Sequence, residues 1–253
     1  MFHFSLLAVS EKATNIVTWI SLGAILALII ALVLICVFNK KYSTNEIAYA
    51  GLCIAASAAL SFVKVSPVTY GGSITLASFV PVLIYAYKCG PIKGTIAGII
   101  LGLFNFISGP YILTPMTFVL DYLLAFASIG LMGFAKMLPK LPQGAKVAIG
   151  TVAVYVFRFV FHLVSGVIYF QEGAIWADLP TPNSFVYSFI YQCVYLPGDF
   201  VISLGVLLAL VKTKTLDKLM NLMSKKQKAE IPETEEDAAV EPDTTVNKDD
   251  TKE

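Results

Sequence analysis

A chain of 253 residues, of which 57% are hydrophobic and 14% charged, has too little polar surface to cover a water-soluble domain. The composition therefore predicts a protein embedded in a lipid bilayer. A helix needs roughly 20 apolar residues to cross the bilayer, so a chain of this length has room for six or seven spans. The net charge of +1 gives no reason to expect binding to nucleic acid.

Seven apolar runs follow one another along the chain, each bounded by glycine, proline or charged residues. They lie at about 14–38, 47–63, 74–87, 94–108, 115–135, 147–170 and 185–211. The third and fourth runs are short for a complete span, and Pro81 lies inside the third, so we expect tilts, kinks or re-entrant ends there. The predicted fold is an all-α membrane protein with a six-helix core.

The chain is expected to divide into four segments. Residues 1–46 hold an extra N-terminal transmembrane helix and a linker, 47–211 the core, 212–228 a basic segment and 229–253 an acidic tail. In the basic segment, Leu216, Leu219, Met220 and Met223 recur at helical spacing, which favours a short helix on the membrane surface. The frayed end of the last span would give the same pattern. The acidic tail is predicted to be disordered.

Lysines are distributed unequally between the two ends of these helices. One end carries Lys40, Lys41, Lys88, Lys93, Lys136, Lys140, Lys146, Lys212, Lys214 and Lys218, whereas the other carries Lys64, with Lys12 in the N-terminal tail. Because lysine and arginine accumulate on the cytoplasmic side of membrane proteins, we expect a cytoplasmic C-terminus and an extracellular N-terminus.

Three charged side chains lie inside the predicted spans, where each costs about 2.5–3.5 kcal/mol unless it has a partner or a function. Arg158, the only arginine, and Asp199 lie near the middle of two consecutive antiparallel helices. We expect a buried ion pair between them that fixes the packing of the two helices. A proton or ion relay is the functional alternative. The third charge, Asp121, lies six residues after Pro115 and has no obvious lysine partner.

Further polar and aromatic side chains are expected at a membrane depth close to that of Asp121. They are Asn105, Tyr122, His162, Tyr169, Phe170, Tyr187, Tyr191 and Gln192, with Tyr111 in the preceding loop. Each alone has a structural explanation, since tyrosines favour membrane interfaces and a histidine in a span often bonds a neighbouring helix. Together they predict a small pocket that opens to the extracellular side.

The chemistry of this pocket limits its ligand. Asp121 is its one group that is charged at neutral pH, and aromatic faces attract cations. The pattern therefore favours a flat, cationic heteroaromatic ligand. No cofactor or metal site is predicted, because Cys36, Cys53, Cys89 and Cys193 occur singly, without the spacing of metal ligands.

Several short motifs occur in one order between about 47 and 211. They are Gly71-Gly72-Ser73, Lys88-Cys89-Gly90, Leu120-Asp121-Tyr122 followed by Ala125-Phe126-Ala127-Ser128-Ile129-Gly130, Arg158-Phe159 with His162, Ser165-Gly166-Val167-Ile168, and Tyr187-Ser188 with Tyr191-Gln192. In this order they resemble the thiamine-specific S components of energy-coupling-factor (ECF) transporters. The resemblance implies a protein of the bacterial cell membrane that captures thiamine outside the cell and releases it inside.

The resemblance also implies roles for individual residues. Asp121 would face the cationic thiazolium ring, and His162 and Phe170 would pack near the rings of the vitamin. The full set of candidate substrate-binding residues is Asp121, Tyr122, His162, Tyr111, Phe170, Tyr187, Gln192 and Asn105. Gln192 replaces an asparagine of the family and should still bond the aminopyrimidine, whereas Phe170 replaces the tryptophan of some members and should stack more weakly.

Members of this family work with a separate transmembrane T subunit and two ATPases. The chain has no Gly-x4-Gly-Lys-Ser/Thr phosphate loop, so ATP hydrolysis would belong to these partners. Gly51, Ala55 and Ala59 form a stripe of small residues on one helix face, which predicts contact with the T subunit or, alternatively, packing within the core. The loop 64–72, with Pro67 and Tyr70, is expected to act as a lid or as a plain connection.

Two functions of other classes compete with this prediction. A self-sufficient, proton-coupled carrier of thiamine or of its hydroxymethylpyrimidine precursor would use the charged residues as a relay, but the two halves of the chain show no convincing repeat. A membrane enzyme is disfavoured, because the spans contain no His-Glu-x-x-His or Gly-x-Ser-x-Gly signature. We therefore expect a transport protein without enzymatic activity.

Overall fold

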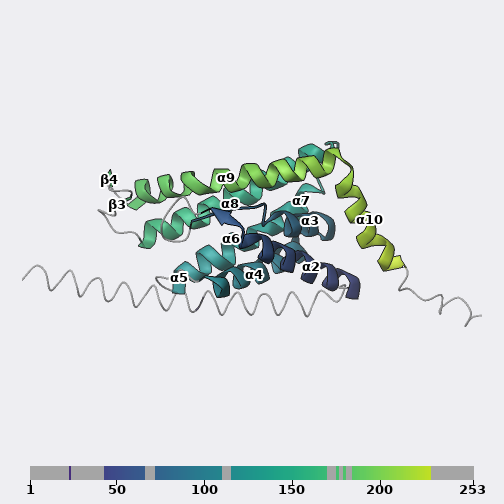
Figure 1. The fold of residues 1–253 in the computed structure, drawn as a ribbon, viewed down its shortest axis with the longest axis horizontal. Helices are drawn as coiled ribbons and strands as arrows, with labels where there is room; N and C mark the ends of the chain where they lie inside the picture. The colour runs from purple at the N-terminus through teal and green to yellow at the C-terminus, as the bar shows by residue number, and fades with distance from the viewer. Residues whose placement is uncertain are drawn as a thin grey trace, which may run out of the picture.

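The structure is a computed structural model that describes residues 23, 43–65, 72–109, 115–169, 175–176, 179–180 and 184–228. Except for Gly23, the expected first helix lies outside these residues, as does the acidic tail. The described chain is almost entirely helical and confirms the six-helix core (Figure 1). Within it, four helices are long and apolar enough to cross a membrane, and a fifth apolar helix is shorter.

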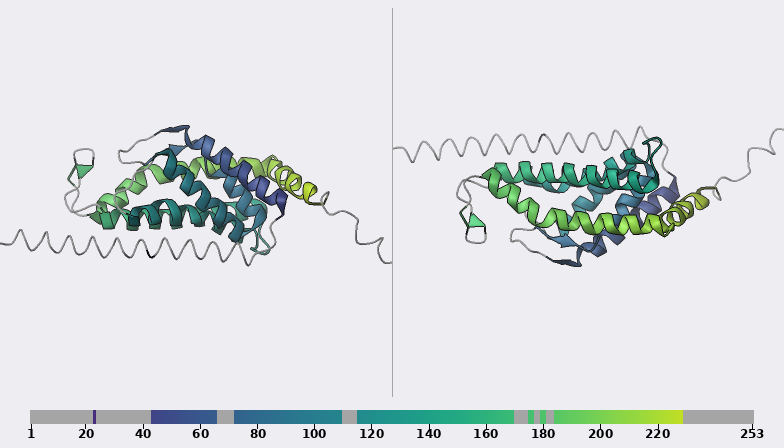
Figure 2. Two further views of the ribbon diagram at one scale, coloured as in Figure 1. Left: turned by 90° about the horizontal axis from the view of Figure 1, so that it is seen from below. Right: turned by 90° about the horizontal axis from the view of Figure 1, so that it is seen from above.

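The core helices follow the chain in order. They are α2 (Thr44–Ser61), α3 (Val80–Cys89), α4 (Pro91–Ser108), the continuous helix Pro115–Ala135, α8 (Gln143–Tyr169) and α9 (Ser184–Lys212). The helix Pro115–Ala135 changes its winding along its length, through α5 (Pro115–Thr117), the π-helix η1 (Phe118–Leu124), α6 (Ala125–Ala127), the 3-10 turn η2 (Ser128–Gly130) and α7 (Leu131–Ala135). The helices α8 and α9 are the longest and lie side by side in all views (Figures 1 and 2).

Two short antiparallel strand pairs interrupt the helices. Strand β1 (Lys64–Val65) pairs with β2 (Ile74–Thr75), so that Lys64 lies opposite Thr75. Strand β3 (Ile175–Trp176) pairs with β4 (Leu179–Pro180) between α8 and α9. The expectation that a helix begins at residue 74 is therefore wrong, and α3 begins six residues later. Proline lacks a backbone N–H and suits the first turn of a helix, so Pro81 lies in the first turn of α3 and does not bend it.

The start of α2 is fixed by a capping box. The Ser43 hydroxyl accepts a hydrogen bond from the backbone N–H of Asn45 (3.2 Å), and the Ser43 N–H donates to the Glu46 carboxylate (3.1 Å). The same carboxylate forms an ion pair with Lys93 at 2.6 Å, which ties α2 to the first turn of α4. The lysine-rich end of the bundle is thus held by side-chain bonds between helices that are distant in sequence.

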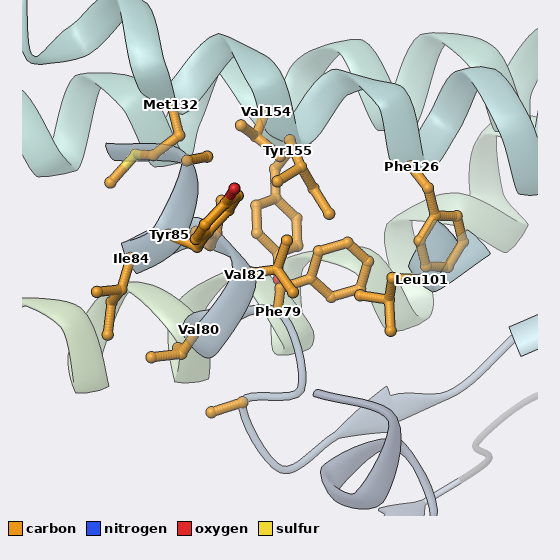
Figure 3. Packing of buried hydrophobic residues seen from close by; sticks show 14 of the residues in the cluster. Phe79, Val80, Val82, Ile84, Tyr85, Leu101, Phe126, Met132, Val154 and Tyr155 are labelled. Atoms are coloured by element: carbon orange, nitrogen blue, oxygen red, sulfur yellow. The ribbon is translucent and has the colours of Figure 1, made fainter. Parts of the chain in front are cut away.

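The short helix α3 lies at the centre of the bundle and contacts α2, α4, α7 and α9. Its residues Val82, Leu83 and Ala86 are fully buried. Figure 3 shows Phe79, at the start of this helix, beside Tyr155 of α8. The Phe79 ring also packs against Phe126, with 5.3 Å between the ring centroids. Phe79 and Phe126 of this aromatic cluster also line a cavity at the end of the bundle opposite Lys88, Lys93 and Lys136.

The basic segment forms a helix of its own, α10 (Thr215–Lys228), which bends away from α9 (Figure 1). Lys214, at φ +57°, makes the turn between the two helices, so the segment is not a frayed end of α9. Leu216 is buried against the core, and Gln143 of α8 donates a hydrogen bond to Asp217 at 2.8 Å. The Tyr49 hydroxyl of α2 donates to the carbonyl of Leu222 at 3.1 Å. The apolar face of α10 therefore packs on the lysine-rich end of the bundle.

Candidate functional site

A cavity of about 220 Å³ lies at the lysine-poor end of the bundle. Its main polar and aromatic lining residues are Asn105 of α4, Asp121 and Tyr122 of η1, Arg158, His162 and Ser165 of α8, and Tyr191, Gln192, Tyr195 and Asp199 of α9. The segment 72–79, which contains β2, supplies further lining residues. Five of the eight candidate substrate-binding residues therefore line one cavity, and they come from four helices.

The other three candidates differ from one another. Tyr187 does not belong to the cavity lining; it is buried one helical turn away and stacks on Tyr191, with 6.1 Å between ring centroids. Tyr111 and Phe170 lie outside the described residues. Pro67 and Tyr70 of the expected lid also lie outside them.

Asp121 is the centre of a hydrogen-bond network that joins η1 to α8. One carboxylate oxygen lies 2.7 Å from Nδ1 of His162, and the other accepts a bond from the Ser165 hydroxyl at 2.7 Å. The guanidinium Nε of Arg158 donates to Nε2 of His162 at 3.3 Å. Since Nε2 accepts this bond, a neutral imidazole carries its proton on Nδ1. Nδ1–H then donates a hydrogen bond to Asp121. Arg158 and Asp121 are therefore linked through a neutral histidine.

The spacing of residues along α8 produces this arrangement. Arg158 and His162 are four residues apart, so they share one helix face, and Ser165 follows on the same side. Ser165 is almost completely buried, whereas the side chains of His162 and Asp121 are 11% and 22% exposed. The network is thus reachable from the cavity but largely shielded from bulk solvent.

The expected ion pair between Arg158 and Asp199 is not formed in the described structure, in which the ion pair of a lysine or arginine with a carboxylate is that of Lys93 with Glu46. Asp199 is buried and accepts hydrogen bonds from the Thr75 backbone N–H (3.0 Å), the Thr75 hydroxyl (2.6 Å) and the Tyr155 hydroxyl (2.8 Å). The sequence did not predict the strand pair β1–β2. This pair brings the backbone N–H and the hydroxyl of Thr75 to the Asp199 carboxylate.

Arg158 has aromatic partners in place of Asp199. Its guanidinium carbon lies 4.0 Å from the centroid of the Phe79 ring and 5.0 Å from that of Phe126. A cation over an aromatic face is stabilised by about 0.5–2 kcal/mol, more when it is shielded from water. The aromatic cluster at the base of the cavity therefore compensates part of the cost of burying this charge.

The segment 72–78 is attached to α9 at two points. The backbone N–H of Gly72 donates to the Tyr191 hydroxyl at 2.8 Å, and Thr75 bonds Asp199 as described above. Beside the second point, a Cβ added at Gly198 would lie 2.7 Å from the Ile74 side chain, so glycine allows β2 to approach α9 closely. The two attachments hold one wall of the cavity in place.

Sequence reasoning missed the π-helix that carries Asp121 and Tyr122. A π-helical turn has one extra residue per hydrogen-bonded ring and occurs often at functional sites. It also missed Tyr195, which is buried, lines the cavity and meets Tyr191 edge to face at 5.7 Å. The four-residue spacing of Tyr187, Tyr191 and Tyr195 was a signal that could have identified it.

Comparison with known proteins places this arrangement in a family. A family model described as thiamine transporter protein (Thia_YuaJ) matches residues 47–219. The chain belongs to this thiamine transporter family. The match covers the six core helices and the first residues of α10.

This thiamine transporter family member is also similar to two named proteins. The thiamine transporter ThiT of Bacillus subtilis (strain 168) is 29% identical over 152 residues, which cover 56% of this chain and 77% of the relative. A solved structure of ThiT from Listeria monocytogenes has a TM-score of 0.56 at 22% identity and covers 68% of this chain and 96% of the other. At that identity, the structural similarity shows a shared fold.

Proposed function

We propose that this chain is the thiamine-binding S component of an ECF-type importer, and that thiamine binds in the cavity with its cationic thiazolium ring near Asp121. The observation that carries this proposal is the network of Asp121, a neutral histidine and Arg158 in a member of the thiamine transporter family. A carboxylate bonded to neutral groups keeps its full charge for a cationic ligand.

The charges around the cavity agree with a cationic ligand. Among the buried and half-buried lining residues that the structure describes, the aspartate and arginine side chains are those of Asp121, Asp199 and Arg158. Two negative charges against one positive charge leave an excess of one negative charge. Lys64 also lines the cavity, but it is exposed to solvent, where its charge is screened.

The remaining polar and aromatic lining residues would orient the ligand. Asn105, Tyr122, His162 and Gln192 are the proposed direct contacts, because each lines the cavity. Tyr187 would act through Tyr191, on which it stacks. For Tyr111 and Phe170 the proposal depends on the family resemblance alone.

We further propose that the cavity opens to the outside of the cell. The lysines of the described helix ends, including Lys88, Lys136 and Lys146, lie at the opposite end of the bundle, and positive residues favour the cytoplasmic side. In this orientation α10 lies at the inner leaflet, where its lysines would face lipid headgroups. The C-terminus is then cytoplasmic and the N-terminus extracellular.

The proposed contact with the T subunit is the small-residue face of α2. Gly51, Ala55 and Ala59 are exposed, and a Cβ added at Gly51 would meet no atom within 4 Å. This exposure supports a contact with a partner over packing within the core. Leu52, on the same exposed side of the helix, is 65% exposed. A small-residue face with open space beside it suits the close approach of another membrane helix.

A binding measurement tests the proposed ligand. The purified protein in detergent is expected to bind thiamine tightly and the neutral hydroxymethylpyrimidine precursor at least tenfold more weakly, about 1.4 kcal/mol, because the precursor lacks the cationic ring. Quenching of intrinsic fluorescence would follow both titrations. Equal affinity for the two compounds would identify the pyrimidine as the ligand, and a folded protein that does not bind thiamine would contradict the proposal.

The proposed partner surface is tested by Ala55→Leu. This variant is expected to bind thiamine like the wild type but to lose most ATP-driven uptake in cells that contain the T subunit and ATPases, because the leucine side chain would hold the partner helix away. The control is Ala209→Leu, the same change at an exposed position of α9, which should leave uptake intact. Loss of thiamine binding in Ala55→Leu would contradict the assignment. Uptake without any ECF ATPase would favour the proton-coupled carrier.

A further inference from the structure

Lysines and exposed apolar side chains follow one another just beyond the end of α7, in the loop 136–142. Lys136 and Lys140 are exposed, and so are Met137, at 71%, and Leu141, at 39%. The apolar span that includes α7 ends at Ala135, which places this loop at the interface between membrane and water. Positive and apolar side chains together suit a partner that is both anionic and apolar.

The position of Lys136 is fixed by the close packing of α7 on the turn between α3 and α4. A Cβ added at Gly133 would overlap backbone atoms of Gly90 and Pro91, so glycine lets the two segments touch. Figure 1 shows α3 and α7 side by side at this end of the bundle. The Lys136 ammonium donates a hydrogen bond to the carbonyl of Lys88 at 3.1 Å, near the end of α3. Lys136 is therefore held at one place on the surface.

Positive charge gathers around Lys136 without a carboxylate to balance it. Desolvation and the charge of the neighbouring Lys88 lower the pKa of Lys136, so the two ammonium groups are close enough to repel each other. Neither Lys136 nor Lys140 lies within 4.0 Å of a carboxylate in the described part of the chain. The bond from Lys136 to the Lys88 carbonyl uses one of three N–H donors. An anion at this place would reduce the repulsion and accept the other donors.

We propose that the loop 136–142 and Lys88 form a binding surface for anionic lipids. The lysine ammonium groups contact the headgroup phosphates, and Met137 and Leu141 enter the adjoining acyl chains. The long lysine stems allow both contacts at one depth, because they lie along the apolar region while the charge stays among the headgroups. A soluble anion would leave the apolar side chains in water. The surface lies at the end of the bundle opposite the cavity, so this inference does not depend on the proposed ligand.

The inference is tested by native mass spectrometry of the purified full-length protein in detergent. Phosphatidylglycerol, which is anionic, is expected to bind at least tenfold more tightly than phosphatidylcholine with the same acyl chains, because the choline cation is repelled by the lysines. Glycerol 3-phosphate, a soluble phosphate without acyl chains, is expected to bind more weakly still. Equal affinity for the two lipids would contradict the inference, and so would glycerol 3-phosphate that binds as tightly as phosphatidylglycerol.

The Lys136→Gln variant assigns the preference to this surface. It removes one charge, so the affinity for phosphatidylglycerol should fall about fivefold, which corresponds to about 1 kcal/mol, while that for phosphatidylcholine stays within twofold. The control is Lys64→Gln, which removes one charge from an exposed lysine at the opposite end and should leave both affinities within twofold. An equal loss in the two variants would show that the preference follows total charge, and the inference would be wrong.

The Met137→Gln variant tests the apolar contact at unchanged charge. Met137 is mostly exposed, so the substitution should not affect folding, and the affinity for phosphatidylglycerol is expected to fall at least threefold. An unchanged affinity would contradict entry of this side chain into the lipid. If Lys136→Gln does not fold, Lys140→Gln takes its place in the same comparison with Lys64→Gln, since Lys140 is exposed. A lysine variant that binds both lipids normally but no longer co-purifies with the T subunit would make the occupant a protein and overturn the inference.

Discussion

Replacing Asp121 by asparagine is expected to weaken thiamine binding by more than tenfold, which corresponds to over about 1.4 kcal/mol. The substitution removes the negative charge that we propose to face the thiazolium ring. It also disturbs the network, because both carboxylate oxygens accept hydrogen bonds, from His162 and from Ser165, and an asparagine has one oxygen to offer. Fluorescence titration of the purified variant with thiamine measures the loss.

The control for this experiment is Asp199→Asn. Asp199 also lines the cavity, but its oxygens are bonded to Thr75 and Tyr155, so its main effect should be on the stability of the segment 72–78. We expect a smaller loss of affinity than for Asp121→Asn and a lower thermal unfolding midpoint, since bonds to a charged acceptor contribute about 1.5–3 kcal/mol. A folded Asp121→Asn protein that binds thiamine like the wild type would contradict the proposed role of Asp121.

The helical core and much of the cavity could be predicted from the sequence, for two physical reasons. A membrane requires long apolar helices, so the apolar runs identify the spans without any alignment. Polar side chains are costly inside these spans, so Asp121, His162 and Gln192 stand out against the apolar background. Similar depth in antiparallel neighbours was then enough to predict that they lie close together, and the structure brings them to one cavity.

The same reasoning failed where depth alone does not decide a contact. Arg158 and Asp199 were expected to pair because they lie at similar depths, but each is turned toward other groups, Arg158 toward His162 and Asp199 toward Thr75. The rotation of a helix about its axis depends on the whole packing of its faces. The two-residue strands β1 and β2 are too short to produce a periodic pattern, and so is the π-helix η1. The sequence therefore carried no signal for them.

The observed network differs from the predicted ion pair in its effect on the charges of Arg158 and the carboxylate. A direct pair of Arg158 with a carboxylate would neutralise both charges inside the protein. With a neutral histidine between them, Arg158 and Asp121 are not paired directly.

Gly102→Ala is expected to lower both the stability of the bundle and its affinity for thiamine. Gly98 and Gly102 lie along the face of α4 that packs on the helix Pro115–Ala135. A Cβ at Gly102 would overlap the carbonyl oxygen of Tyr122 and lie 3.0 Å from the Phe126 side chain. Because the first of these is a backbone atom, no side-chain rotation can relieve the overlap, and overpacking of this kind costs about 1–3 kcal/mol.

The effect on binding distinguishes this prediction from simple destabilisation. The carbonyl that would be displaced belongs to the π-helical turn that carries Asp121, so the carboxylate should move relative to His162. Thermal unfolding in detergent and thiamine titration below the unfolding temperature measure the two effects separately. The control is Gly51→Ala, where the added methyl group meets no atom within 4 Å, so thiamine affinity should not change and stability should not fall, because alanine is favoured over glycine inside a helix. Normal affinity in a destabilised Gly102→Ala protein would show that the position of Asp121 does not depend on the contact between α4 and the π-helix.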